Sequence, residues 1–92
     1  MVNAIVLLSI ERDLINDVAE KLVDLEDVTE VYSVAGQYDL VAILRVSDDD
    51  GIASLVTDEM LKIEGMISSE TLIAFRAYSN YDLGRMFSIG MD

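Results

Sequence analysis

VYSVAGQYDLVAILRV, Val31–Val46, specifies the fold more clearly than any other segment of the chain. Two runs of alternating and β-branched residues flank Ala-Gly-Gln-Tyr-Asp, which is the composition of a β-hairpin. The second strand of this hairpin is apolar on both faces, and Asp39 stands directly against the apolar run. A strand with one solvated face would alternate apolar and polar residues. The hairpin therefore belongs to a sheet whose two faces are both shielded from water.

The sequence on either side of the hairpin alternates between the period of a strand and the period of a helix. Each expected helix carries one apolar stripe for burial against a sheet. The stripe residues are Leu14, Ile15, Val18, Leu22 and Leu25 in the first helix, and Ile52, Leu55, Val56, Met60 and Ile63 in the second. The expected elements are a strand over 2–10, a helix over 11–25, strands over 26–34 and 38–46, a helix from Ser47 to a stop at Gly65, and a strand over 66–75.

This order, β-α-β-β-α-β, predicts an α+β protein with the ferredoxin-like fold. Right-handed crossovers give a four-stranded antiparallel sheet with both helices on one face. The fold is expected to occupy residues 1–76. Residues 77–92 are expected to form a C-terminal tail with a short helix, because Ser79 and Asp82 have capping-box spacing before an apolar run.

The start of the second helix carries three consecutive acids, Asp48, Asp49 and Asp50. Ser47 is the expected N-cap, with Asp50 at the third helical position. The acids suit the positive end of the helix dipole, and they lack the spaced oxygen ligands of a calcium loop. No metal site is predicted here.

The face of the sheet without helices is expected to be apolar, because the first and third strands do not alternate. Its candidate residues are members of two sets or their alternates, depending on the register of the strands: Val2, Ile5 and Leu7 in the first strand, and Val41 and Ile43 in the third. A monomer seldom exposes such a patch, so the sequence predicts a homodimer joined through this face. The alternative is that the C-terminal tail folds back over it.

The amino-acid composition argues against several classes of function. The net charge of −12 leaves few cations to bind phosphates, so direct nucleic-acid binding is not expected. The chain has no His and no Cys, which removes the usual bases, nucleophiles and metal ligands, and no cofactor is expected. No apolar run approaches the ~20 residues of a membrane span, and a cytoplasmic location is the default. Whether the acidity reflects a halophilic source stays open.

The loop of the hairpin is the candidate site. Gly36 is a turn residue suited to positive φ, without the second Gly and the Lys of a phosphate loop. Tyr38 and Asp39 are ordinary turn residues, so the residues alone leave a ligand site and a plain turn equally open.

Two motifs, VTEVYSVAGQYDLVAILRV and GMISSETLIAF, together resemble the effector-binding (RAM) domain of the Lrp/AsnC feast/famine regulators, over about residues 2 to 76. The resemblance implies a ferredoxin-like domain that dimerises through its sheets, often assembles into rings of dimers, and binds a free amino acid between dimers. It places the effector site on Gly36, Gln37, Tyr38, Asp39, Ser69 and Thr71.

The chain is expected to depart from those regulators, because the first strand is expected directly after Met1, without the helix-turn-helix that precedes this domain in them. The expectation is a stand-alone, non-enzymatic sensing module that modulates a full-length relative through mixed assembly. Two alternatives remain. One is an enzyme of the dimeric α/β-barrel type, whose members often use the His that this chain lacks. The other is a structural oligomerisation partner with no ligand.

Overall fold

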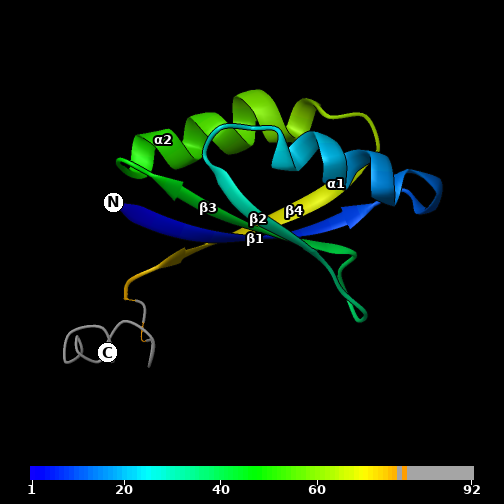
Figure 1. Ribbon diagram of the computed structural model, residues 1–92, viewed down its shortest axis with the longest axis horizontal. Helices are drawn as coiled ribbons and strands as arrows, with labels where there is room; N and C mark the ends of the chain where they lie inside the picture. The colour runs from blue at the N-terminus through cyan, green and yellow to red at the C-terminus, as the bar shows by residue number, and fades with distance from the viewer. Residues whose placement is uncertain (77, 79–92) are drawn as a thin grey trace, which may run out of the picture.

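One sheet and one layer of helices make up the part of the chain that the computed structural model describes, residues 1–76 and 78 (Figure 1). The helix expected within 77–92 lies outside the described residues. No helix in the described part is long and apolar enough to cross a membrane. The elements, in chain order, are β1 (Val2–Ile10), the 3₁₀ turn η1 (Arg12–Leu14), α1 (Ile15–Val23), β2 (Val28–Ser33), β3 (Leu40–Val46), α2 (Asp49–Ser54), the π turn η2 (Leu55–Glu59), the 3₁₀ turn η3 (Met60–Lys62) and β4 (Met66–Ala74).

The sheet has the order β2-β3-β1-β4, and every neighbouring pair is antiparallel. β1 and β3 are the central strands, paired from Val2 opposite Val46 to Leu8 opposite Leu40. Both helical segments lie on the same side of the sheet (Figure 1). The ferredoxin-like fold predicted from the sequence is confirmed.

The core lies between this helical layer and the sheet. Alternate residues of the central strands point into it, since side chains along a strand face opposite sides in turn. Full burial of a side chain such as Leu8 or Leu44 stabilises the fold by about 1.5–3 kcal/mol. The buried strand residues are Ala4, Val6, Leu8 and Ile10 of β1 and Leu40, Ala42, Leu44 and Val46 of β3, and the helices add Val18, Leu22, Ile52, Leu55, Val56 and Met60.

The second helix begins one residue later than predicted. Its N-cap is Asp48, not Ser47: the Asp48 backbone is extended (φ −155°), and its Oδ1 accepts a hydrogen bond from the Gly51 N–H at 2.8 Å. An N-cap side chain accepts from the second or third amide of the helix, and Gly51 is the third residue of a helix that begins at Asp49. The carboxylate of Asp48 therefore serves the helix start.

Gly65 ends the second helical segment, and both its backbone conformation and its packing require a glycine. Its φ is +104°, which L side chains rarely adopt. A Cβ at this position would lie 3.0 Å from Leu14 Cβ and 3.1 Å from Val18 Cγ2. The Gly65 carbonyl accepts from the Glu11 N–H at 2.8 Å. The entry to β4 is thus held against the start of α1 by a residue without a side chain.

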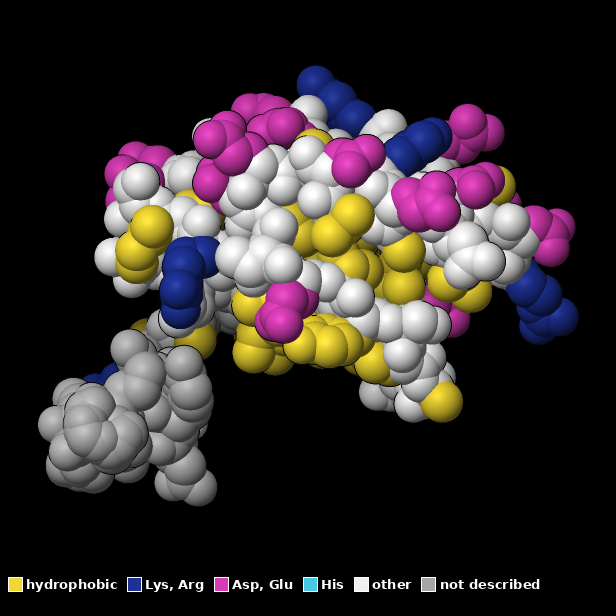
Figure 2. All heavy atoms as spheres, in the orientation of Figure 1, with side chains coloured by type: hydrophobic (Ala, Val, Ile, Leu, Met, Phe, Trp, Pro, Cys, Tyr) yellow, Lys and Arg dark blue, Asp and Glu magenta, His cyan; other side chains and the backbone are white. Residues whose placement is uncertain are grey.

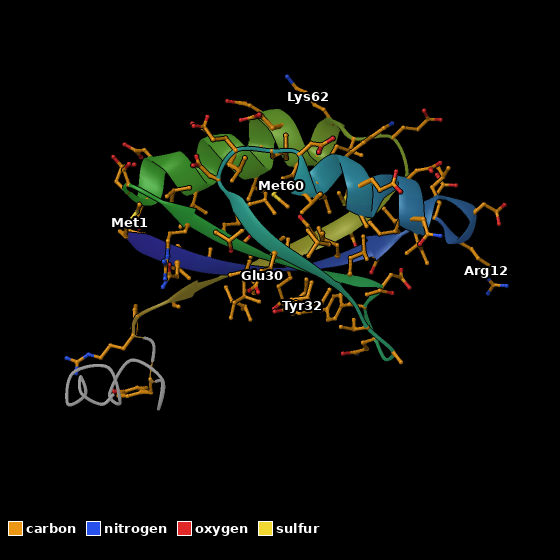
Figure 3. The ribbon with its side chains drawn as sticks, viewed as in Figure 1. Met1, Arg12, Glu30, Tyr32, Met60 and Lys62 are labelled. Carbon is orange, nitrogen blue, oxygen red and sulfur yellow. The ribbon has the colours of Figure 1, made fainter. Side chains whose placement is uncertain are left out.

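The helix-free face of the sheet is apolar, as the sequence predicts. Leu7 pairs with Val41 and Ile5 pairs with Ile43, and all four are half-buried with their side chains away from the helices. Tyr32 on β2 lies on the same side (Figure 3). Figure 2 shows acidic side chains gathered over the helices and hydrophobic ones gathered beneath the sheet. We call this surface, Ile5, Leu7, Tyr32, Val41, Ile43 and Leu72, the apolar face.

Candidate functional site

The loop that joins β2 to β3 spans residues 34–39 and lies beside the end of β1. Gly36 has φ +142°, so its backbone conformation favours glycine. A Cβ built on Gly36 would meet no atom within 4 Å. The backbone at this glycine is therefore open to an approaching ligand.

Asp39 fixes this loop to the sheet. Its N–H donates to the Leu8 carbonyl at 2.8 Å, and its own carbonyl accepts from the Val34 N–H at 3.1 Å. Its side-chain Oδ2 accepts from the Ile10 N–H at 2.8 Å. The side chain thus continues the β1–β3 ladder beyond Leu40, where the backbone pairing has ended.

These bonds explain an acid beside an apolar strand. The Ile10 amide would otherwise be a partly buried donor without a partner at the end of β1, and leaving such a group unpaired costs about 1–3 kcal/mol. Asp39 therefore stabilises its own turn. A carboxylate has two oxygens and about four lone-pair sites, so the bond to Ile10 does not exhaust its capacity for a ligand.

The closing strand places the two predicted hydroxyls on the helix side. Ser69 stands opposite Leu8 and Thr71 opposite Val6, whose side chains point into the core. Ser69 is half-buried and Thr71 is exposed. Because β1 lies between β3 and β4, about 10 Å of sheet separates these backbones from the start of β3. The predicted site residues therefore lie at one end of the sheet in two separate groups, the loop residues 36–39 and the hydroxyls of Ser69 and Thr71.

One direct contact joins the loop to β4, on the helix-free side, and it involves a residue that the sequence analysis missed. The Tyr38 hydroxyl donates to Glu70 Oε1 at 2.6 Å. Glu70 stands opposite Leu7, on the helix-free side. The sequence SSET contains the signal that could have identified Glu70. Successive side chains of a strand point to opposite faces, so Glu70 must face away from Ser69 and Thr71 and lie on the apolar surface.

The carboxylate of Glu70 also changes the acidity of the phenol. It accepts the hydrogen bond only from the protonated form, which raises the pKa of Tyr38 above its usual 10.0. Glu30 raises the pKa of Tyr32 in the same way. A raised pKa means that this contribution to stability is present at neutral pH and is lost as the pH rises through the folded-state pKa.

We therefore expect Glu70→Gln to lower the pKa of Tyr38 and leave that of Tyr32 unchanged. Glu30→Gln is the matched control, because it should lower the pKa of Tyr32 alone. Phenolate absorbance in an alkaline titration, with each tyrosine assigned by its Phe variant, measures both. Equal effects of the two substitutions on Tyr38 would contradict the contact.

Within residues 1–76 and 78, no group of three or more His, Cys, Asp or Glu side chains is arranged to hold a metal ion.

Comparisons with known proteins identify relatives of the whole described fold. The family model described as the Lrp/AsnC ligand binding domain matches residues 3–83. TTHA0845 from Thermus thermophilus is 41% identical in sequence and superposes with a TM-score of 0.82, over 87% of this chain and 100% of that one. A regulator of Mycobacterium tuberculosis, Rv3291c, whose structure is a complex with L-methionine, is 22% identical with a TM-score of 0.74, over 87% of this chain and 54% of that one. At that identity the likeness concerns the fold.

Among curated proteins, the HTH-type transcriptional regulator YugG of Bacillus subtilis is 27% identical over 77 residues, which is 84% of this chain and 45% of that protein. The HTH-type regulator FL11 of Pyrococcus furiosus is 28% identical over 75 residues, 82% of this chain and 49% of that protein. The chain thus spans about half the length of the curated relatives it matches.

Proposed function

Because this chain belongs to the Lrp/AsnC ligand-binding domain family, we propose that it is a non-enzymatic sensing module that binds a free amino acid. The site would be formed by Gly36, Gln37, Tyr38 and Asp39 of the loop with Ser69 and Thr71 of β4. The observation that carries the proposal is the loop itself, which Asp39 holds to β1 while the Gly36 backbone stays open. The L-methionine complex of the relative Rv3291c supports an amino acid as the ligand class.

The chemistry of the loop suits an α-amino acid. Backbone N–H groups around a glycine turn can receive the α-carboxylate, and the carboxylates of Asp39 and Glu70 can attract the α-ammonium group. Charge-assisted hydrogen bonds contribute about 1.5–3 kcal/mol each. Two or three of them, reduced by the entropy lost on binding, give a Kd in the micromolar to millimolar range. This range suits a sensor of metabolite concentration.

We further propose that the module is a homodimer joined through the apolar face, and that dimers assemble into larger rings. Tyr32 is 48% exposed and Leu72 is 44% exposed beside the half-buried centre of this face, which supports a second copy as its cover. A ligand held between dimers would bind the assembled form more tightly than the free dimer. Mass action then couples binding to assembly.

In the cell, the module would act in the cytoplasm on a full-length regulator of the same family, by mixed assembly. The HTH-type regulators among its relatives support this partner.

Thermal denaturation in the presence of each of the twenty amino acids tests the proposal. At a ligand concentration of about 100 times Kd, binding stabilises the folded state by about 2.7 kcal/mol. We expect at least one amino acid to raise the Tm and to shift the oligomer distribution measured by light scattering. If none does so at concentrations up to tens of millimolar, about ten times the weakest expected Kd, the chain is a structural oligomerisation partner without a ligand.

A further inference from the structure

A hollow of about 480 Å³ opens on the helix-free side of the sheet, at the end where β1 begins. Residues of all four strands line it, and so do Arg76 and Tyr78 beyond β4. Its apolar wall is formed by Ile5, Ile43 and Ala74. Ile5 and Ile43 also belong to the apolar face, so the proposed homodimer would bury the hollow. Protein interiors and well-packed interfaces leave few voids of this size, so side chains of the second copy should fill it.

The charged residues of the four strands are Glu30, Arg45 and Glu70, and all three lie on the helix-free side. They are exposed and surround the apolar centre, which is the arrangement of a binding interface with a polar rim. Arg45 lines the hollow, and its Nε donates to Asn3 Oδ1 at 3.0 Å. That bond orients the guanidinium and leaves its Nη groups to serve as donors. The hollow therefore offers a guanidinium beside an apolar wall.

The edge strand β2 presents the complementary pair of side chains. Tyr32 stands opposite Val41, and both Tyr32 and Glu30 point to the helix-free side (Figure 3). Tyr32 is 48% exposed, and Glu30 is exposed as well. β2 thus carries an aromatic ring and a carboxylate next to each other. These two groups match the apolar wall and the guanidinium of the hollow in shape and in charge.

We propose that β2 of the second copy fills this hollow in the homodimer, with the partner's Tyr32 inside it and the partner's Glu30 paired with Arg45. The inference rests on the proposed association through the apolar face. The planar fork of a guanidinium matches the two oxygens of a carboxylate. The ring of the partner's Tyr32 would contact Ile5 and Ala74. Because a twofold interface is isologous, each dimer contains this contact twice.

The contact also fixes how the two sheets cross. The centre of the apolar face is bounded by Ile5, Leu7, Val41 and Ile43. The hollow is centred about 7 Å from this point along the strands, and β2 lies about 7 Å from it across the strands. A twofold axis that runs diagonally from Ile43 to Leu7 exchanges these two directions and places the partner's β2 over the hollow. The sheets then cross at about a right angle, which is one of the two common ways in which sheets pack.

The opposite diagonal would place β4 of the second copy, with Leu72 and Glu70, over the hollow instead. Two observations favour β2. The carboxylate of Glu70 already accepts a hydrogen bond from the Tyr38 hydroxyl at 2.6 Å, which holds it beside its own loop. In addition, β2 supplies an aromatic side chain, and Tyr is enriched among the residues that dominate binding at interfaces.

Charge reversal in separate chains tests the pairing. Glu30→Arg and Arg45→Glu each place like charges opposite one another in their own homodimers, so each should weaken self-association about tenfold or more. Mixing the two variant chains restores both pairs across the interface, although like charges remain within each chain. We therefore expect the mixture to form heterodimers with about the affinity of wild type. Native mass spectrometry counts them, because the two chains differ in mass.

Arg12→Glu mixed with Glu30→Arg is the matched control. It combines the same two net charges, but Arg12 is exposed at the opposite end of the molecule from Met1 (Figure 3). This mixture should show no preference for heterodimers. An equal preference would reflect net charge alone and would overturn the proposal. Rescue of Arg45→Glu by Glu70→Arg instead of Glu30→Arg would also overturn it, since β4 would then occupy the hollow.

Truncation of the aromatic side chain provides a second test. Tyr32→Ala should weaken the dimer about tenfold or more, and Leu72→Ala should weaken it less. A wild type that dimerises no better than Tyr32→Ala would overturn the proposed contact and leave the dimer itself intact. A monomeric wild type would overturn both the contact and the dimer. Circular dichroism of each variant confirms that the fold is retained.

Discussion

Replacing Asp39 by alanine is expected to lower the Tm by about 8–16 °C in the absence of any ligand. The substitution removes the acceptor of the Ile10 N–H, a hydrogen bond of 2.8 Å to a carboxylate oxygen. A bond of this kind is worth about 2 kcal/mol, and in a domain of this size 1 kcal/mol moves the Tm by about 4–8 °C. Calorimetric or spectroscopic melting at neutral pH measures the change.

Two further variants assign the loss to this bond. Asp39→Asn keeps an oxygen acceptor without the charge. It should lower the Tm by about half as much as Asp39→Ala, because neutral hydrogen bonds are roughly half as strong as charged ones. Asp58→Ala makes the same substitution at an exposed position of η2 and should change the stability by less than about 0.5 kcal/mol. If Asp39→Ala melts like Asp58→Ala, the carboxylate does not hold the turn.

Replacing Val41 by glutamate is expected to convert the dimer to a monomer. Val41 lies on β3 opposite Leu7, in the centre of the apolar face. In a symmetric dimer each copy would bury one unpaired carboxylate. An uncompensated buried charge costs about 3–5 kcal/mol, which weakens association by about a thousandfold or more. Light scattering at micromolar concentration should give at least twice the chain mass of 10.2 kDa for wild type, and that mass itself for the variant.

Val23→Glu is the matched control for this prediction. It is the same substitution on α1, where the valine is already 51% exposed on the helical side of the molecule. This variant should keep the mass of wild type. A monomeric wild type, or a Val41→Glu variant that still associates, would show that another surface carries the assembly or that none does.

The fold could be predicted because periodicity alone specifies it. Side chains along a strand point to opposite faces in turn, which divides Ala4, Val6 and Leu8 from Ile5 and Leu7, and the structure places these two sets on opposite faces of the sheet. The helical stripes were equally clear, with Val18, Leu22 and Met60 fully buried. The N-cap was misplaced at Ser47 instead of Asp48 because two capping residues stand side by side, and only the backbone dihedrals decide between them.

For the site, the sequence predicted which segments contribute residues but not which contacts those residues make. The sequence does not show that Asp39 would satisfy the Ile10 amide, because that contact joins residues 29 positions apart. Nor does it show that Tyr38 would reach Glu70 across β1. Arg45 and Arg76 look like scattered charges in the sequence, and only the paired strands and the exit from β4 bring them to one hollow.

Binding of an amino acid by the loop and β4 can be observed residue by residue through amide chemical-shift mapping. A ¹⁵N-labelled sample would be titrated with the amino acid that raises the Tm most. We predict saturable chemical-shift changes at the amides of Gly36, Gln37, Tyr38 and Asp39 and of Ser69–Thr71. These changes should be larger than those at control amides in α1 and η2. Saturable binding that leaves the amides of 36–39 unmoved would show that the amino acid binds elsewhere.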